Sequence, residues 1–206
     1  MRPGINPPGS CSARWPGNGP PVQAGRPPLI KNPPLLTPPL SAEDHVDGPE
    51  RAELELVMYG DFQCPYCTAA YPIVRRIRDK LAGRLLFGFR HFPLRDIHPD
   101  AERAAEAAEA AAAQGAFWEM HDRMYESNGA LSREDLIGYT AELGLDSDRV
   151  AAELDSSAHA ARVQRDVDNG LASGVTGTPS FFVGGRLHMG SFDAASLTAA
   201  LEASKS

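Results

Sequence analysis

The sequence predicts an α/β fold, with strands and helices alternating along one domain. Three observations carry this prediction. Short runs typical of strands lie at residues 53–59, 85–89 and 181–189. A helix-like apolar spacing follows the first run, and a much longer helical stretch separates the second run from the third. Alternating or continuous apolar runs indicate strands, whereas apolar residues spaced three and four apart indicate helices.

The first 50 residues have a different composition from the rest of the chain. They hold thirteen of the eighteen prolines, including repeated Pro-Pro pairs, and no hydrophobic period. Such a segment cannot bury enough apolar surface to offset the entropy of ordering it. We therefore expect residues 1–42 to form a proline-rich disordered leader and residues 43–206 to form the domain.

Charge and hydropathy exclude several classes of protein. The net charge is −7, and the sequence has no block of basic residues, so we expect no nucleic-acid partner. No apolar run reaches the length of a membrane span, so no transmembrane segment is expected. A secretory signal is not visible, which predicts a cytoplasmic protein. If the start of the protein has been assigned wrongly, a periplasmic or other extracytoplasmic location stays open.

The strand expected at residues 53–59 leads through a short turn into a helix that opens at Cys64. Pro65 falls in its first turn, where a missing N–H costs nothing. Pro72 lies inside the helix, and Gly83 is expected to end it. The predicted apolar face comprises Ile73, Val74, Ile77 and Leu81.

Several helices are expected between residues 99 and 172. Residues 101–113 are almost entirely Ala and Glu, which favour helix, and their glutamates are expected to form a solvated face: Glu102, Glu106 and Glu109. Ser132 and Asp135 have the spacing of a capping box. An apolar stripe is expected to belong to the core: Phe117, Met120 and Met124.

A β-hairpin and a final helix complete the predicted order. Phe181-Phe182-Val183 and residues 186–189 flank Gly184-Gly185, a two-residue turn of the type that joins hairpin strands. Asp193 is expected to cap the C-terminal helix, which carries Leu197 and Leu201.

The motif Cys64-Pro65-Tyr66-Cys67 carries the chemistry. At a helix N-terminus, free N–H groups and the helix dipole stabilise a thiolate, so Cys64 is expected to be an exposed, low-pKa nucleophile. Cys67, one turn later, is expected to be the resolving thiol. No cofactor is needed for this chemistry. A zinc site would require a second ligand pair, which the sequence lacks, and an inert buried pair would not explain the strand-to-helix position.

Thr178-Pro179 lies between the last long helical stretch and the hairpin. A threonine–proline step at a strand entry is common by itself. Beside a Cys-x-x-Cys motif, a cis proline would present the Thr178 backbone to an extended peptide as an added strand. We therefore expect Thr178 and Pro179 to bind substrate.

The sequence around these motifs resembles the DsbA-like branch of the thioredoxin superfamily, including DsbA-like domains fused to sodium/proton antiporters. The resemblance rests on residues 59–67, on His91-Phe92-Pro93-Leu94, on residues 115–121 and on residues 174–179. It implies a thioredoxin fold with a helical insertion at about residues 99–172. It also implies that Cys64 and Cys67 are the catalytic pair and that Pro179 is the family's cis proline.

Two positions depart from relatives of this kind. Met58 stands where many of them carry a glutamate that is thought to help protons move, so Asp61 or Glu55 would have to substitute. The active-site dipeptide, Pro65-Tyr66, resembles that of glutaredoxins more than the Pro-His of strongly oxidising DsbA proteins. This dipeptide predicts a reduction potential between the extremes of about −270 and −120 mV for thioredoxin and DsbA.

The sequence therefore predicts a thiol–disulfide oxidoreductase that exchanges disulfides with protein substrates and is served by a redox partner. One alternative is a non-catalytic peptide-binding or chaperone-like module on the same fold, which would have no need of both thiols. Another is a glutathione-dependent enzyme acting on small molecules, a class that commonly lacks the second cysteine.

Overall fold

A five-stranded mixed sheet forms the centre of the fold in the computed structural model, which describes residues 32–205. The spatial order of the strands is β1-β3-β2-β4-β5. Their bounds are β1 His45–Asp47, β2 Leu54–Gly60, β3 Leu85–His91, β4 Ser180–Val183 and β5 Arg186–Leu187. β2 is therefore the central strand, and the chain leaves it directly toward the cysteine motif.

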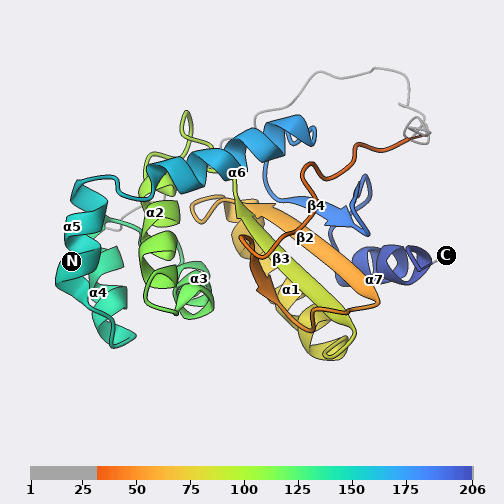
Figure 1. Cartoon of the computed structure of the whole chain (residues 1–206), viewed down its shortest axis with the longest axis horizontal. Helices are drawn as coiled ribbons and strands as arrows, with labels where there is room; N and C mark the ends of the chain where they lie inside the picture. Colours follow the sequence, from red (N-terminus) through yellow and green to blue (C-terminus); the bar gives the residue numbers. More distant parts are fainter. Residues whose placement is uncertain (1–31, 206) are drawn as a thin grey trace, which may run out of the picture. The chain divides into compact units, whose positions relative to one another are not determined.

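The central strands combine one parallel and one antiparallel pairing. β2 and β3 run parallel, with Met58 opposite Phe89, and are joined by α1 (Pro65–Lys80). β4 pairs antiparallel with the other side of β2, which places Ser180 beside Tyr59. Pro179, which directly precedes β4, therefore lies at the end of the sheet from which α1 begins. Figure 1 shows β4 beside β2.

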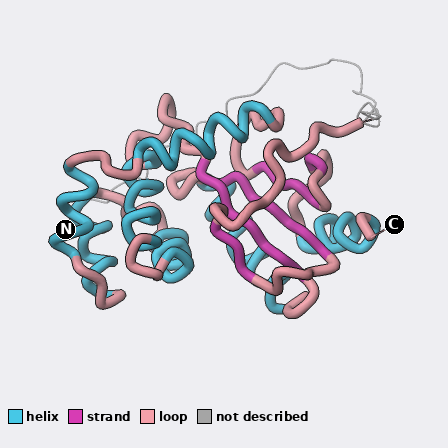
Figure 2. Tube along the Cα trace, viewed as in Figure 1, coloured by secondary structure: helices cyan, strands magenta, loops and turns pink. Residues whose placement is uncertain are grey.

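Five helices lie between β3 and β4 in the sequence. The first four form a region to one side of the sheet, and the fifth extends from this region to the sheet (Figure 2). The five are α2 Ala101–Ala112, α3 Phe117–Glu126, α4 Arg133–Glu142, α5 Ser147–Asp155 and α6 Ala160–Ala172; α7 (Ala194–Ala203) follows the hairpin. From β2 onward the element order agrees with the predicted one, but the sequence did not predict β1. The thioredoxin fold is confirmed. Within residues 32–205, no helix combines the length and apolar character required to cross a bilayer.

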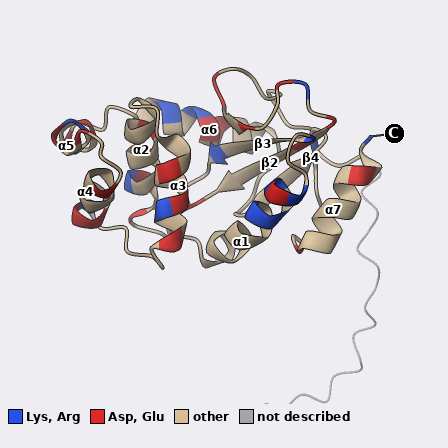
Figure 3. Ribbon diagram, turned by 90° about the horizontal axis from the view of Figure 1, so that it is seen from below, with Lys and Arg blue, Asp and Glu red and all other residues tan. Residues whose placement is uncertain are grey.

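The sheet buries side chains on both faces, because alternate residues of β2 point in opposite directions. Leu56 and Met58 belong to the larger core, together with side chains of α1 and α7. Val57 and Tyr59 belong to a smaller core on the opposite face. Figure 3 shows charged residues of both signs on the outer side of α1, as expected for a helix with one buried face.

The chain before β1 packs on the domain, contrary to the prediction that it is disordered as far as residue 42. Leu36 is only 5% exposed and belongs to the smaller core. Its N–H donates to the Gly185 carbonyl at 2.9 Å, and the Thr37 N–H donates to the Ser173 hydroxyl at 2.8 Å. The prediction is wrong for residues 32–42 because isolated leucines there supply apolar anchors that no periodicity reveals. Residues 1–31 lie outside the described residues.

A buried arginine holds this segment in place. Arg90 of β3 is 1% exposed and pairs with Asp44 through two hydrogen bonds of 2.7 and 3.0 Å. Its remaining donors reach the Pro38 carbonyl at 2.9 Å, the Pro39 carbonyl at 3.1 Å and the Tyr59 hydroxyl at 3.0 Å. All sides of the guanidinium are therefore occupied, and the backbone of the N-terminal segment supplies two of its acceptors.

Truncation tests the contribution of residues 32–42. A chain that begins at residue 43 loses the burial of Leu36 and two carbonyl acceptors of Arg90, whereas a chain that begins at residue 32 keeps both. We expect the shorter chain to be less stable by about 3 kcal/mol, the combined scale of one buried leucine and unsatisfied hydrogen bonds to a charged group. Urea denaturation of the two reduced proteins measures the difference; equal midpoints would show that this segment contributes nothing.

Candidate functional site

The two cysteines lie at the N-terminus of α1. Cys64 is the N-cap residue, and its carbonyl accepts the first helical hydrogen bond, from the Thr68 N–H at 3.0 Å. Pro65 occupies the start of the helix, where its fixed φ suits the first turn. Both thiols are free in this structure. Cys64 is 2% exposed and Cys67 is fully buried, so the prediction of an exposed Cys64 is wrong.

The segment before β4 covers Cys64. When it is protonated, the Cys64 thiol donates to the Thr178 carbonyl at 3.4 Å, a contact between residues 114 positions apart in the chain. The peptide bond between Thr178 and Pro179 is cis, as predicted. The fold therefore brings together the two motifs that sequence analysis singled out, one before α1 and one before β4.

The environment of Cys64 favours its thiolate. A hydrogen bond from the Cys67 thiol is the largest influence and lowers the pKa of Cys64 to about 5, against the opposing effect of burial. Thr178 and the backbone N–H groups of Tyr66 and Cys67 lower this pKa further. Backbone donors at a helix N-terminus stabilise an anion at this position. Cys64 is therefore ionised at neutral pH in the reduced protein.

Cys67 has the opposite character. Burial raises its pKa well above the usual value, and the hydrogen bond to Cys64 and the negative charge there raise it further. A buried thiol beside a thiolate remains protonated until that thiolate is consumed. The pair thus contains one ionised and one protonated sulfur, in the order that the sequence predicts.

The dipeptide between the cysteines lies at the surface. Tyr66 is 66% exposed although it is a large aromatic residue, and Pro65 is exposed as well. A further exposed apolar residue, Met189, lies beyond β5 at 58% exposure. Near it, a hollow of about 250 Å³ is lined by residues that include Pro179, Phe181 and Met189.

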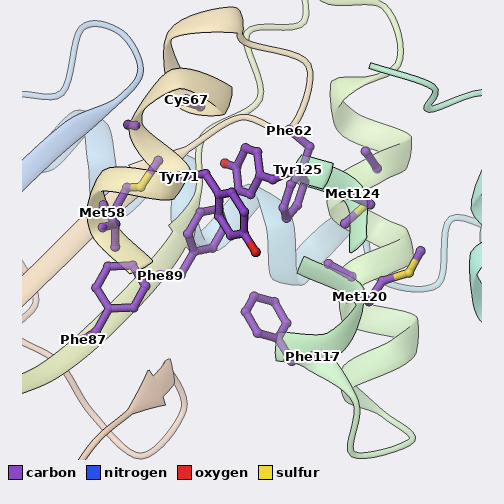
Figure 4. Close-up of a cluster of buried hydrophobic side chains, with 14 of the residues drawn as sticks. Met58, Phe62, Cys67, Tyr71, Phe87, Phe89, Phe117, Met120, Met124 and Tyr125 are labelled. Carbon is purple, nitrogen blue, oxygen red and sulfur yellow. The ribbon is translucent and has the colours of Figure 1, made fainter. Parts of the chain in front are cut away.

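The two carboxylates expected to compensate for Met58 are not free to do so. Met58 is buried in the same core as Cys67 (Figure 4). Glu55 lies three residues before Met58 on β2, so its side chain points to the opposite face of the sheet. There the charge of Arg90 lowers its pKa, against the larger effect of burial, which raises it. Asp61 is 2% exposed, and both of its carboxylate oxygens are engaged.

Asp61 has a structural role at the start of the active-site loop. One carboxylate oxygen accepts from the Gln63 N–H at 2.8 Å; the other accepts from the Leu94 N–H at 2.9 Å and lies 2.7 Å from His98 Nδ1. These contacts tie the turn before Cys64 to the chain that follows β3. His98, which lies in the turn before α2, therefore contacts the carboxylate of the active-site loop.

Helix α3 supplies a side chain that sequence analysis missed. Phe117, Met120 and Met124 are buried, as predicted. Tyr125 is also buried at 3% exposure, and its hydroxyl has no hydrogen-bond partner within residues 32–205. Figure 4 shows it beside Phe62 and Tyr71, in the core below Cys67. Its place eight residues after Phe117, on the same helical stripe, is the signal that could have identified it.

A second buried cluster overturns the expectation of a solvated glutamate face on α2. Glu106 and Glu109 are each 6% exposed, because neighbouring helices cover α2. Glu109 Oε1 lies 2.8 Å from His45 Nε2 and 2.9 Å from His91 Nε2. Burial opposes ionisation of Glu109, but the two histidines outweigh it and hold its pKa well below the usual value.

These three side chains could in principle hold a cation, since their ligand atoms all lie within 4.8 Å of one another. Two features disfavour such a site. The Arg162 guanidinium approaches the same Glu109 oxygen at 3.7 Å, and His91 Nδ1 has no acceptor in the described part of the chain. A metal-bound histidine normally donates its second N–H to an acceptor. The cluster is therefore a buried hydrogen-bonded network of Glu109 and two histidines.

Comparison with known proteins agrees with this geometry. Residues 40–203 match the protein family described as Thioredoxin. An Na(+)/H(+) antiporter NhaA 1 of Salinispora arenicola (strain CNS-205) is 47% identical over 167 residues, which cover 81% of this chain. The chain spans only about a quarter of the length of such curated relatives, 26% in this case.

Solved structures share the fold at low sequence identity. The oxidised BdbD of Bacillus subtilis superposes with a TM-score of 0.73 at 20% identity, over 84% of this chain and 96% of that one. The thiol-disulfide exchange protein alpha-DsbA2 of Wolbachia pipientis gives a TM-score of 0.67 at 20% identity, over 79% and 88% of the two chains. The chain therefore belongs to the thioredoxin family and has the DsbA-type thioredoxin fold.

Proposed function

We propose that the protein is a thiol–disulfide oxidoreductase that exchanges disulfides with protein substrates through Cys64 and Cys67. The observation that carries this proposal is the pair of unlike sulfurs at the start of α1: the pKa of Cys64 is lowered to about 5, while that of Cys67 is raised. A thiolate is the attacking species in disulfide exchange, and a protonated neighbour is held for the second step.

The reaction proceeds in two steps that conserve sulfur and electrons. The Cys64 thiolate attacks one sulfur of a substrate disulfide, forms a mixed disulfide and releases the first substrate thiolate. Cys67 then loses its proton and attacks Cys64, which forms the Cys64–Cys67 disulfide and releases the second substrate thiolate. The substrate gains two electrons and the protein loses them. In the reverse direction the same steps oxidise a substrate dithiol, and a redox partner restores the starting state.

Thr178 and Pro179 are assigned to substrate binding. The Thr178 carbonyl lies against the Cys64 sulfur, so a peptide that reaches this sulfur must pass along the same segment. The exposed ring of Tyr66 and the hollow near Met189 flank this approach with apolar surface. An extended peptide presents both the backbone groups and the apolar side chains that such a surface would bind.

The presence of Cys67 separates this proposal from its alternatives. A non-catalytic peptide-binding module would require neither a low-pKa thiol nor a second one. A glutathione-dependent enzyme acting on small molecules would use Cys64 but would not need Cys67. Reduction of insulin in the presence of dithiothreitol tests the proposed activity, and a thiol count before and after reduction tests the disulfide. A protein that binds peptides but does not accelerate insulin reduction would refute the proposal.

The titration of Cys64 gives a second prediction. Because its pKa is lowered to about 5, alkylation by iodoacetamide should rise as the pH increases through 5 and then level off by neutral pH. Below pH 5 the thiol is protonated and labelling should fall. Peptide mapping identifies the labelled cysteine, and free cysteine, which ionises near pH 8.5, is the control. A labelling profile like that of free cysteine would contradict the lowered pKa of Cys64, and preferential labelling of Cys67 would reverse the assigned roles.

A further inference from the structure

The Tyr125 hydroxyl is a buried polar group that stabilises the fold through no hydrogen bond within residues 32–205. The ring of Tyr125 packs against Phe62 with centroids 5.0 Å apart and against Tyr71 with centroids 5.4 Å apart. A buried hydroxyl without a partner costs free energy that a phenylalanine at this position would avoid. The hydroxyl therefore calls for an explanation other than stability.

The hydroxyl is directed toward the active-site loop. A Cβ atom added to Gly60, the last residue of β2, would lie 2.9 Å from the Tyr125 oxygen. Gly60 immediately precedes Asp61, whose backbone N–H is among the groups that lower the pKa of Cys67. The absence of a side chain at position 60 thus leaves space for the Phe89 ring and, next to it, for the Tyr125 hydroxyl at the end of β2 that leads to the cysteines.

Charge at the cysteines reaches this hydroxyl. Burial raises the pKa of Tyr125 well above its usual value; negative charge at Cys67, Asp61 and Cys64 and a polar contact of the hydroxyl with the Cys67 sulfur raise it further. The phenol consequently stays protonated at neutral pH and is available as a donor. It is a donor beside Cys67, where a thiolate must form during the second step of exchange.

The Thr178 hydroxyl also lowers the pKa of Cys67, so Tyr125 would be a second hydroxyl donor to this sulfur. Three other groups are unsuited to this role. Met58 carries no proton, the Asp61 carboxylate is occupied by Gln63, Leu94 and His98, and Glu55 lies on the opposite face of the sheet. We propose that the Tyr125 hydroxyl donates a hydrogen bond to the Cys67 thiolate as it forms, and so assists the resolving step. This inference rests on the proposed function of Cys64 and Cys67.

The assisted step is the attack of Cys67 on the mixed disulfide. The Cys67 thiol loses its proton to solvent, the new Cys64–Cys67 bond forms, the bond from Cys64 to the substrate breaks, and the departing substrate thiolate takes up a proton. Tyr125 keeps its own proton throughout. Its contribution is a preorganised dipole directed at the charge that develops on Cys67.

The expected size of the effect follows from two opposing factors. A hydrogen bond to a charged group stabilises it enough to shift a pKa by about one to two units. Without that bond the thiolate fraction of Cys67 falls by about ten- to a hundredfold, but the more basic thiolate is a better nucleophile. The net result is a resolving step about three- to tenfold slower at neutral pH.

Tyr125→Phe in the full-length protein tests the inference. The protein also carries Cys11→Ser, because this third cysteine would react with the same reagent. Stopped-flow reaction of the reduced protein with an aromatic disulfide reagent releases one chromophoric thiolate when Cys64 attacks and a second when Cys67 resolves. The second release is independent of reagent concentration and reports Cys67 alone. We expect its pH midpoint to rise by about one to two units in Tyr125→Phe, while the first release is unchanged.

Tyr71→Phe is the matched control, because the Tyr71 ring stacks on Tyr125 but its hydroxyl donates to Glu126 at 3.0 Å. This variant should keep the wild-type pH midpoint. An unshifted midpoint in Tyr125→Phe, or equal shifts in both variants, would overturn the inference. If Tyr125→Phe does not fold, 3-fluorotyrosine at position 125 provides the test. Its more acidic hydroxyl should lower the pH midpoint of the second release, and an unchanged midpoint would count against the proposal.

The same experiment separates this inference from the proposed function. Wild-type protein that shows no concentration-independent second release would refute the resolving role of Cys67, and with it both proposals. A normal second release in wild-type protein with no response to the changes at Tyr125 would refute the inference alone.

Discussion

Replacing Cys67 with alanine is expected to convert the protein into a trap that stays covalently bound to its substrates through Cys64. The first attack requires only the Cys64 thiolate, which backbone N–H groups of α1 continue to stabilise. Without Cys67, no second thiol of residues 32–205 lies beside the mixed disulfide to release the substrate. Non-reducing electrophoresis should therefore show substrate-linked species that disappear on addition of dithiothreitol, and insulin reduction should fall to the uncatalysed rate.

Cys64→Ala provides the matched control. It keeps Cys67, whose sulfur is fully buried and whose pKa is raised, so no mixed disulfide is expected. Because Cys67 also lowers the pKa of Cys64, the trapping variant should attack its substrates more slowly at pH 6 than the wild-type protein does. Equal trapping by both variants, or trapping by Cys64→Ala alone, would contradict the assigned roles.

Replacing Asp44 with asparagine should cause the largest loss of stability from a single charge change. The substitution leaves the Arg90 guanidinium, 1% exposed, without its carboxylate partner. Removing one member of a buried ion pair typically costs about 3–5 kcal/mol, because the remaining charge stays desolvated. Denaturant unfolding of the reduced protein measures this cost.

A surface pair in the same region supplies the control. Asp47 of β1 pairs with Arg78 at 2.6 Å, but its side chain is 49% exposed. Asp47→Asn should therefore cost no more than about 1 kcal/mol. Combining Asp44→Asn with Arg90→Met should recover part of the loss, since the unpaired charge is then removed as well. Equal costs for Asp44→Asn and Asp47→Asn would show that burial does not set the strength of the Arg90 pair.

The Asp44 contribution should also depend on pH. Burial opposes ionisation of this carboxyl, but the hydrogen bonds and charge of Arg90 outweigh it and lower its pKa. A carboxyl whose folded pKa is depressed adds stability that is fully present above its unfolded value, near 3.9, and is lost as the pH falls through the folded value. The stability difference between wild-type protein and Asp44→Asn should consequently be constant from pH 5 to 7 and shrink below pH 4.

Local patterns were sufficient to predict the redox motif and the order of the elements from β2 onward, but not the short strand β1. The alternation before Gly60, the cap at Ser132 and the Gly184-Gly185 turn each act within a few residues of the chain. Ser132 and Asp135 do form the predicted capping box. The position of Cys64 at a helix start follows from the same short-range chemistry.

Features that depend on long-range packing could not be predicted in this way. Glu109 sits in an alanine-rich helix with the pattern of an exposed face, yet neighbouring helices cover it and two histidines supply its partners. Cys64 is covered by Thr178, which lies 114 residues away. The expected substitutes for Met58 failed because residue spacing does not reveal that Asp61 is engaged by the chain after β3.

The route of residues 32–47 has a consequence for self-association. At one border of the sheet, Leu35 pairs with Arg186 of β5; at the other, β1 pairs with β3. Unpaired strand borders are templates on which a second molecule can extend a sheet, and short, covered borders suppress such growth. One stretch of chain thus covers the β5 border and itself supplies the short strand that forms the other border. A molecule in which this stretch detaches would present the β5 border to its neighbours, so a concentrated sample should begin to aggregate well before the central strands unfold.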